Sequence, residues 1–146
     1  MRSPQQKMNY IIQQLNKSKK SGGGYLFWKI IWRYYQIKYL LSIPASTKIG
    51  EKFKIVHYGN IVINNGVTIG NNVSVAQGVT LGLAFGGKKK GCPKIEDNVY
   101  IGANSTIVGN VVIGKNSFIA PNTFINFDVP EDSLVIGSPG EVHKRH

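Results

Sequence analysis

A six-residue period in the aliphatic residues governs most of this 146-residue chain. Within each of three runs, an aliphatic residue returns at every sixth position. These leading residues are Ile49, Ile55 and Ile61, then Ile69, Val75 and Leu81, and then Ile95, Ile101, Ile107, Ile113, Ile119 and Ile125. The period fits neither an amphipathic helix, which repeats about every 3.6 residues, nor hairpin strands, which alternate every two or so.

Six residues are enough for one short strand and one turn, so three repeats close a coil of about eighteen residues. A second buried row is expected four positions after the leads, at the small or β-branched residues Val73, Val79, Val99, Ser105, Val111, Ser117 and Thr123. A glycine often follows the lead, and we expect it to serve a corner with unusual φ. The pattern predicts an all-β fold over residues 42–146, a parallel β-helix of about four coils.

Two interruptions of the period mark irregular segments. Ile61 and Ile69 are eight positions apart, which predicts a small bulge near Asn64–Gly66. Leu81 and Ile95 are fourteen apart, and the intervening stretch has three consecutive lysines and no aliphatic rhythm. It predicts an excursion loop over 82–94, and protruding loops on rigid scaffolds often carry function.

Charge separates an N-terminal head from this repeat. The net charge is +11, and residues 1–48 contain nine Lys or Arg but no Asp or Glu. Residues 1–24 are predicted to be a flexible basic arm and linker, because the segment is polar and ends in three glycines. Residues 25–41 are predicted to be an amphipathic aromatic helix, a short α-helical extension of the β-helix.

Two interpretations of helix 25–41 remain open. It packs on its own domain or on a neighbouring subunit, or it lies on an anionic membrane with its aromatic residues at headgroup depth. Its three charges argue against a membrane-spanning segment. The dense, bulky aromatics do not suit a stacking platform for bases, so no nucleic acid is expected as a partner.

The composition favours an intracellular globular protein. Hydrophobic residues make up 42% of the chain, which excludes global disorder. Cys92 is the only cysteine and cannot form an intrachain disulfide, which suits a reducing compartment. We expect a cytoplasmic location, with peripheral contact at the inner face of the membrane if helix 25–41 binds lipid.

Three segments carry a resemblance to a known family: I-G-N-N-V-S-V-A-Q-G-V-T-L-G, the stretch K-I-E-D-N-V-Y-I-G-A-N-S-T-I-V-G-N-V-V-I-G-K-N, and the closing V-I-G-S-P-G. They resemble the hexapeptide-repeat acyltransferases, most nearly the serine acetyltransferases and their relatives that act on sugars and polysaccharides. The resemblance implies a left-handed parallel β-helix, a homotrimer with active sites between subunits, acetyl-CoA as donor and no metal.

His57 matches the catalytic histidine of this family. The chemistry is independent of the resemblance, because a hydroxyl that attacks a thioester must lose its proton and imidazole titrates near neutral pH. His57 is also the only histidine before the terminal E-V-H-K-R-H. A γ-type carbonic anhydrase of the same fold needs three imidazoles on one zinc, so that function is excluded.

The resemblance also implies which residues hold acetyl-CoA. The excursion loop is similar to the family's glycine-rich cofactor loop, and two alanines match small positions beside the pantetheine. The expected cofactor-binding residues are Gly82, Gly86, Gly87, Lys88, Lys89, Ala103 and Ala120. The lysines would meet phosphates, although a solvated charge run is the simpler explanation.

Three positions depart from the serine-specific pattern and would border the acceptor. Val56 and Ser42 stand where serine acetyltransferases have aspartates, and Gly91-Cys92 replaces their Arg-His pair. Free serine needs charged partners, so we expect a hydroxyl of a sugar or polysaccharide as acceptor. The alternatives are serine O-acetylation, N-acetylation of an amino-sugar nucleotide, and an inactive membrane-docked scaffold.

Overall fold

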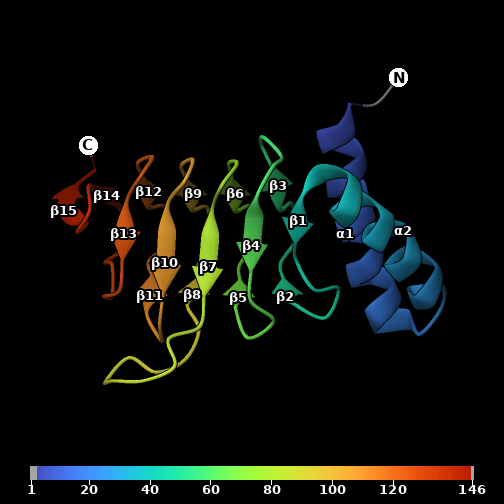
Figure 1. Ribbon diagram of the computed structural model, residues 1–146, viewed down its shortest axis with the longest axis horizontal. Coiled ribbons are helices and arrows are strands. Elements are labelled where there is room, and N and C mark those ends of the chain that lie inside the picture. Colours follow the sequence, from blue (N-terminus) through green and yellow to red (C-terminus); the bar gives the residue numbers. More distant parts are fainter. Residues whose placement is uncertain (1–2, 146) are drawn as a thin grey trace.

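The chain winds into a three-sided parallel β-helix that is closed at one end by two helices (Figure 1). The computed structural model describes residues 3–145. The first sheet contains β1 (Leu41–Ser42), β4 (Ile61–Ile63), β7 (Thr80–Gly82), β10 (Thr106–Val108) and β13 (Phe124–Ile125). The second contains β2 (Lys48–Ile49), β5 (Thr68–Ile69), β8 (Lys94–Ile95) and β11 (Val112–Ile113). The third contains β3 (Lys54–Ile55), β6 (Ser74–Val75), β9 (Tyr100–Ile101), β12 (Phe118–Ile119), β14 (Ser133–Ile136) and the antiparallel edge strand β15 (Glu141–Lys144).

The leading aliphatic residues form the core, as predicted. Ile101, Ile107, Ile113 and Ile119 are fully buried, and each stacks on the equivalent residue of the neighbouring coil. The second row is buried as well, with every predicted member at most 1% exposed. Ser105 lies in this row and is satisfied because its hydroxyl donates to the carbonyl of Ala120 at 2.9 Å.

The strand register corrects one predicted lead and one predicted bulge. Ile63, not Ile61, is the residue that pairs with Leu81 across β4 and β7. Ile63 to Ile69 is a regular step of six, so no bulge is needed at Asn64–Gly66. The two additional residues lie instead in the corner before Ile63, since Ile55 to Ile63 spans eight positions.

Asparagines, rather than the glycines after each lead, adopt the positive φ of the corners. Asn72, Asn98 and Asn116 have φ of 55°, 60° and 59°, and their side-chain amides bond to one another in a ladder at 3.0 Å. The glycines are required for a different reason. A Cβ on Gly102 would lie 2.6 Å from the backbone nitrogen of Pro121 in the next coil, so close coil stacking excludes a side chain.

The arm predicted to be flexible is instead a helix. α1 spans Pro4–Ser21, begins with a capping box between Ser3 and Gln6, and ends at Gly22 in a left-handed conformation. One apolar face carries Met8, Ile11, Ile12 and Leu15, all at most 3% exposed. Burial of this face against the first coil and α2 stabilises a segment whose polar composition alone would not hold a helix.

The second helix follows after the glycines and packs beside the first. α2 spans Tyr25–Tyr39, close to the predicted 25–41. Its Trp32 is 1% exposed and donates its indole N–H to the carbonyl of Ile43 at 2.8 Å. One face of α2 therefore packs on the protein itself. Among the described residues, no helix is long and apolar enough to cross a membrane.

The helices also complete the hydrogen bonds of the first coil, whose outer edge has no preceding strand. The side-chain oxygen of Asn9 accepts the backbone N–H of Ile55 at 2.9 Å, and the side-chain amide of Asn16 donates to the carbonyl of Ile49 at 2.7 Å. An open β-edge left unpaired is a site of aggregation, so the two helices act as a cap on the β-helix.

Candidate functional site

His57 lies in the corner between β3 and β4, the corner that is two residues longer than its counterparts. The equivalent corners from Val75 to Leu81 and from Ile101 to Ile107 span six positions. The longer corner projects beyond the others at the top of Figure 1. His57 is exposed, and no hydrogen bond to its imidazole is found within residues 3–145. Neither ring nitrogen therefore has a partner in the described chain.

The residues beside His57 hold this corner on the scaffold. Val56 is half-buried, and its N–H donates to the carbonyl of Val75 at 2.9 Å. Tyr58 packs edge-on against Tyr39 at the end of α2, with 4.6 Å between ring centroids. The helical cap thus braces the corner that carries the candidate base, a contact that the sequence patterns did not predict.

The excursion loop joins β7 to β8 and extends away from the body (Figure 1). The first sheet thus has two edges that run across its strands: the edge where the strands begin carries the His57 corner, and the edge where they end carries the loop. It folds as a small hairpin in which Ala84 and Gly91 exchange two backbone hydrogen bonds of 2.9 and 3.0 Å. Gly86 and Gly87 lie at its exposed tip, where a Cβ would meet no atom within 4 Å. Gly82 ends β7 and pairs with Val108.

The three loop lysines differ in their surroundings. Lys89 forms a salt bridge of 2.6 Å with Asp128, two coils further on. That hydrogen bond, with one from the N–H of Val112, lowers the pKa of Asp128. Lys88 and Lys90 are exposed and take part in no salt bridge among the described residues. Lys89 therefore anchors the loop, while Lys88 and Lys90 present free charge.

Cys92 has a structural position at the base of the loop. It is half-buried, and its Sγ lies 3.4 Å from the side-chain oxygen of Asn64. That oxygen also accepts the N–H of Gly66 at 2.9 Å. Cys92 is thus held against the corner of the preceding coil.

The expected site residues divide between two edges of the first sheet. Ala103 and Ala120 are half-buried and lie in the same column of corners as His57, two and three coils further along. Gly82, Cys92 and the rest of the loop lie on the other edge. A single chain brings the candidate base and the alanines onto one column but leaves the loop on the far side of the sheet.

Ser42 is not brought into a hydrogen bond with His57. It is exposed on β1, paired in register with Val62, and lines a shallow cleft of about 540 Å³ with residues of α2. Within residues 3–145, no group of three His, Cys, Asp or Glu side chains is arranged to hold a metal.

Comparison with known proteins shows which sequences this chain resembles. Residues 92–126 match the family Bacterial transferase hexapeptide (six repeats). A serine acetyltransferase of Staphylococcus epidermidis is 41% identical over 105 residues, which cover 72% of this chain and 49% of the relative. This chain thus spans about half the length of the curated relatives that it matches.

Solved structures agree with the sequence comparison. The Neisseria gonorrhoeae serine acetyltransferase in complex with serine has a TM-score of 0.73 at 28% identity, covering 91% of this chain and 54% of that one. A serine acetyltransferase in complex with CoA has a TM-score of 0.71 at 29% identity, covering 94% and 55%.

These findings correct the predicted acceptor. The sequence favoured a sugar or polysaccharide because Val56, Ser42 and Cys92 depart from the serine-specific pattern, but the relatives at about 40% identity are serine acetyltransferases. The departures at these positions show which charged side chains are missing, but they do not show whether a charge near the acceptor comes from another residue. Lys90, one position before the replaced pair and free of any salt bridge among the described residues, offers a positive charge from a different position.

Proposed function

Because this chain resembles the hexapeptide-repeat transferases, and the serine acetyltransferases above all, we propose that it is a left-handed β-helical O-acetyltransferase that moves acetyl from acetyl-CoA to the hydroxyl of serine. The observation that carries the proposal is the longer corner with an unpartnered, exposed histidine on an otherwise regular scaffold. We expect the reaction to take place in the cytoplasm.

His57 is the general base of the proposed reaction. It takes the proton from the serine hydroxyl as the oxygen attacks the acetyl carbonyl, and it returns that proton to the departing CoA thiolate. Imidazole accepts the proton in its neutral form, and the imidazolium so formed returns it to the thiolate. Since no side chain among the described residues bonds to the ring, the substrates themselves would complete its orientation.

The groups expected to hold acetyl-CoA can surround one donor molecule if they come from two copies of the chain, one copy supplying the loop and the other the column of alanines. Lys88 and the open tip at Gly86 and Gly87 would hold phosphates, whereas Ala103 and Ala120 leave room for the pantetheine. These groups lie on opposite edges of one chain, so we propose a homotrimer in which the loop of one subunit faces the His57 corner of its neighbour.

Lys90 is proposed to bind the carboxylate of serine. It is exposed, it has no salt-bridge partner among the described residues, and it directly precedes Gly91-Cys92. Charge-assisted hydrogen bonds to a carboxylate are among the stronger polar contacts. Lysine presents a point charge, whereas the arginine of the serine-specific pattern could bind a carboxylate through two parallel N–H groups, so looser recognition of the carboxylate is expected.

The proposed function is tested by release of free thiol from acetyl-CoA in the presence of single acceptors. Serine is expected to give the highest kcat/KM, and an amino-sugar nucleotide and a simple glycoside should give little or none. His57→Ala must abolish the same signal. Turnover of the amino-sugar nucleotide with none of serine would overturn the proposal.

We also propose that the outer face of α2 rests on an anionic lipid surface. The large exposed side chains of this face are Leu26, Phe27, Ile30, Tyr34, Ile37 and Leu40, between 58% and 69% exposed. The whole head contains no acid among residues 1–48. A second copy on this face would oppose like charges, whereas anionic headgroups complement them.

Sedimentation with vesicles tests the lipid contact. The wild-type protein is expected to pellet with phosphatidylglycerol vesicles and not with phosphatidylcholine vesicles, and Ile30→Glu/Ile37→Glu should remove the binding. Ile136→Glu/Val142→Glu places the same two charges on other exposed apolar residues and should leave binding intact. A concentration-dependent increase in mass without vesicle binding would show a protein partner instead.

A further inference from the structure

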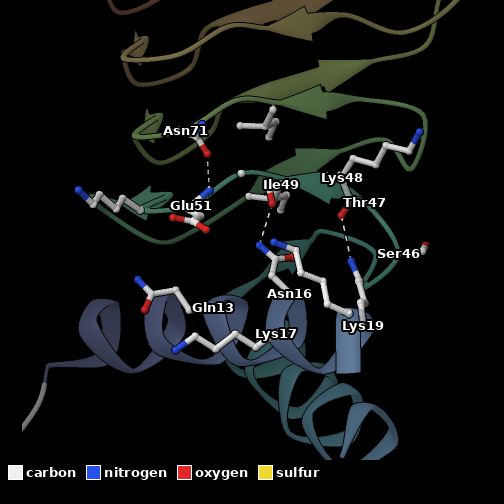
Figure 2. A pocket seen from close by; sticks show the side chains of 14 residues that line it. Gln13, Asn16, Lys17, Lys19, Ser46, Thr47, Lys48, Ile49, Glu51 and Asn71 are labelled. Carbon is white, nitrogen blue, oxygen red and sulfur yellow. Dashed lines mark hydrogen bonds between the residues drawn. The ribbon is translucent and has the colours of Figure 1, made fainter. Parts of the chain in front are cut away.

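A lysine-rich cleft lies away from the proposed active site, between the second half of α1 and the first coil (Figure 2). Its volume is about 650 Å³, within the range of sites for small organic ligands. Lys17, Lys19 and Lys20 line the helical wall, while Lys48 and Lys52 line the β-helix wall. Glu51 is the one acid in the lining, against five lysines.

The charge in this cleft is not neutralised by the protein. The salt bridges found within residues 3–145 are Lys89–Asp128 and Lys94–Glu96, and neither involves the cleft. Lys19 reaches across the cleft and donates to the carbonyl of Thr47 at 3.1 Å (Figure 2). Partial burial lowers the pKa of Lys19, because its ammonium group has lost water and gained only a neutral acceptor. An anion in the cleft would favour the charged form.

The walls of the cleft are held in place by other side chains. Asn16 bonds to the carbonyl of Ile49 across the floor, and Asn71 accepts the N–H of Glu51 at 2.8 Å (Figure 2). Thr47 lines the same cleft, and its Oγ1 is the buried side-chain polar atom without a hydrogen-bond partner in the described chain. Lys17, Lys20, Lys48 and Lys52 are all exposed and available to a ligand.

From this arrangement we infer that the cleft binds a polyanion with at least two phosphate groups. Five lysines on two walls carry more positive charge than one phosphate would neutralise, whereas a diphosphate supplies a second charged group for the facing wall. Ammonium groups bind phosphate as point charges and do not require bidentate geometry. Such a ligand would join the helical cap to the first coil.

This site is separate from the proposed reaction. His57 and the excursion loop are absent from the lining of the cleft. Binding of a diphosphate there should therefore be unchanged in Lys88→Gln, since Lys88 is proposed to hold the phosphates of acetyl-CoA. Because a ligand that binds only the folded protein stabilises it, binding should also raise the melting temperature.

Titration calorimetry of the full chain with inorganic pyrophosphate at low ionic strength tests the inference. We expect saturable binding of one pyrophosphate per chain, unchanged in Lys88→Gln. Lys17→Gln/Lys20→Gln should weaken it by about tenfold or more, as the loss of two charge-assisted contacts predicts. Lys48→Gln, from the other wall, should weaken it by about threefold.

A matched control separates the cleft from general positive charge. Lys54→Gln/Lys115→Gln removes the same charge from exposed positions outside the cleft, and its affinity should stay within about twofold of wild type. Equal weakening in the control, weakening of the same size in Lys88→Gln, or no saturable binding would overturn the inference. Circular dichroism of each variant verifies that it is folded.

Two competing ligands identify the source of the phosphates. ADP supplies a soluble diphosphate, and dibutyryl phosphatidic acid supplies a lipid headgroup without forming a bilayer. Competition with pyrophosphate by ADP alone indicates a nucleotide-like ligand, and competition by the short-chain lipid indicates a headgroup. Competition by neither, with pyrophosphate bound at the cleft, leaves an inorganic polyphosphate as the ligand class.

Discussion

The two edges of the first sheet differ in how they depart from the six-residue repeat. On one edge, a corner gains two residues and stays tied to the scaffold through Val56 and through Tyr58, which packs on Tyr39. On the other, eight additional residues form a hairpin whose tip touches nothing. The proposed base, which must be positioned, lies on the edge tied to the scaffold, whereas the groups proposed to hold the long, flexible donor lie on the open one.

Removal of His57 should have the largest effect of any change on either edge. His57→Ala is expected to lower kcat by about 10²–10⁴-fold, the usual contribution of general-base catalysis. The free energy of unfolding should not change, because the side chain is exposed and unpartnered. Steady-state kinetics and urea unfolding of the same preparation measure both; turnover within about threefold of wild type would contradict the assignment.

Substituting glycine by alanine on each edge compares their rigidity directly. In Gly102→Ala, the new Cβ would meet the backbone at Ile119 and Pro121, so we expect a loss of about 1–3 kcal/mol of stability. Gly86→Ala, at the loop tip, meets open space and should change stability by no more than about 0.5 kcal/mol. Urea unfolding at one fixed protein concentration makes the comparison; equal losses would mean that the loop is packed in solution.

The free charge of the loop should affect substrate binding rather than chemistry. Lys90→Gln is expected to raise the KM for serine by about tenfold, since a charge-assisted contact contributes about 1.5 kcal/mol or more. Lys88→Gln serves as the matched control and should raise the KM for acetyl-CoA instead. An unchanged KM for serine in the Lys90 variant would require another cation for the carboxylate.

The sequence predicted the β-helix well because each coil repeats the same information. A buried lead at every sixth position needs no knowledge of distant contacts. The lead of β4 was placed wrongly at Ile61 because Ile61 and Ile63 are both aliphatic and both buried. Only the pairing of Ile63 with Leu81 distinguishes them, and that pairing also moves the irregularity into the His57 corner.

The sequence patterns did not predict the helix of residues 4–21 or the acceptor correctly. Met8, Ile11, Ile12 and Leu15 have helical spacing behind a Ser3–Gln6 capping box, yet the surrounding lysines and glutamines suggested a flexible arm. The helix depends on burial against the first coil, which is a tertiary effect. The acceptor was predicted wrongly because only the absent side chains were weighed, whereas the relatives at about 40% identity are serine acetyltransferases. The Lys90 side chain forms no salt bridge in the described chain, and we propose it as the replacement charge.

The anchor of the loop should give the smallest effect. Asp128→Asn removes the salt bridge to Lys89, but both side chains are largely exposed, so the loss of stability should stay below about 1 kcal/mol. We expect the KM for acetyl-CoA to rise about two- to threefold, with kcat unchanged, because a looser loop positions the donor less often. Hydrogen exchange should increase at the amides of Ala84 and Gly91.

The pH dependence of this contact has a defined sign. Lys89 lowers the pKa of Asp128, so the anchoring is fully present above the ordinary carboxyl range near pH 4 or so. It is lost as pH falls through the lower, folded-state value. Loop exchange in wild type should therefore be constant from about pH 5 to 8 after correction for intrinsic rates, and should rise only in stronger acid. A rise between pH 5 and 7 would show that another group holds the loop, and the contrast between the two edges would then rest on a different contact.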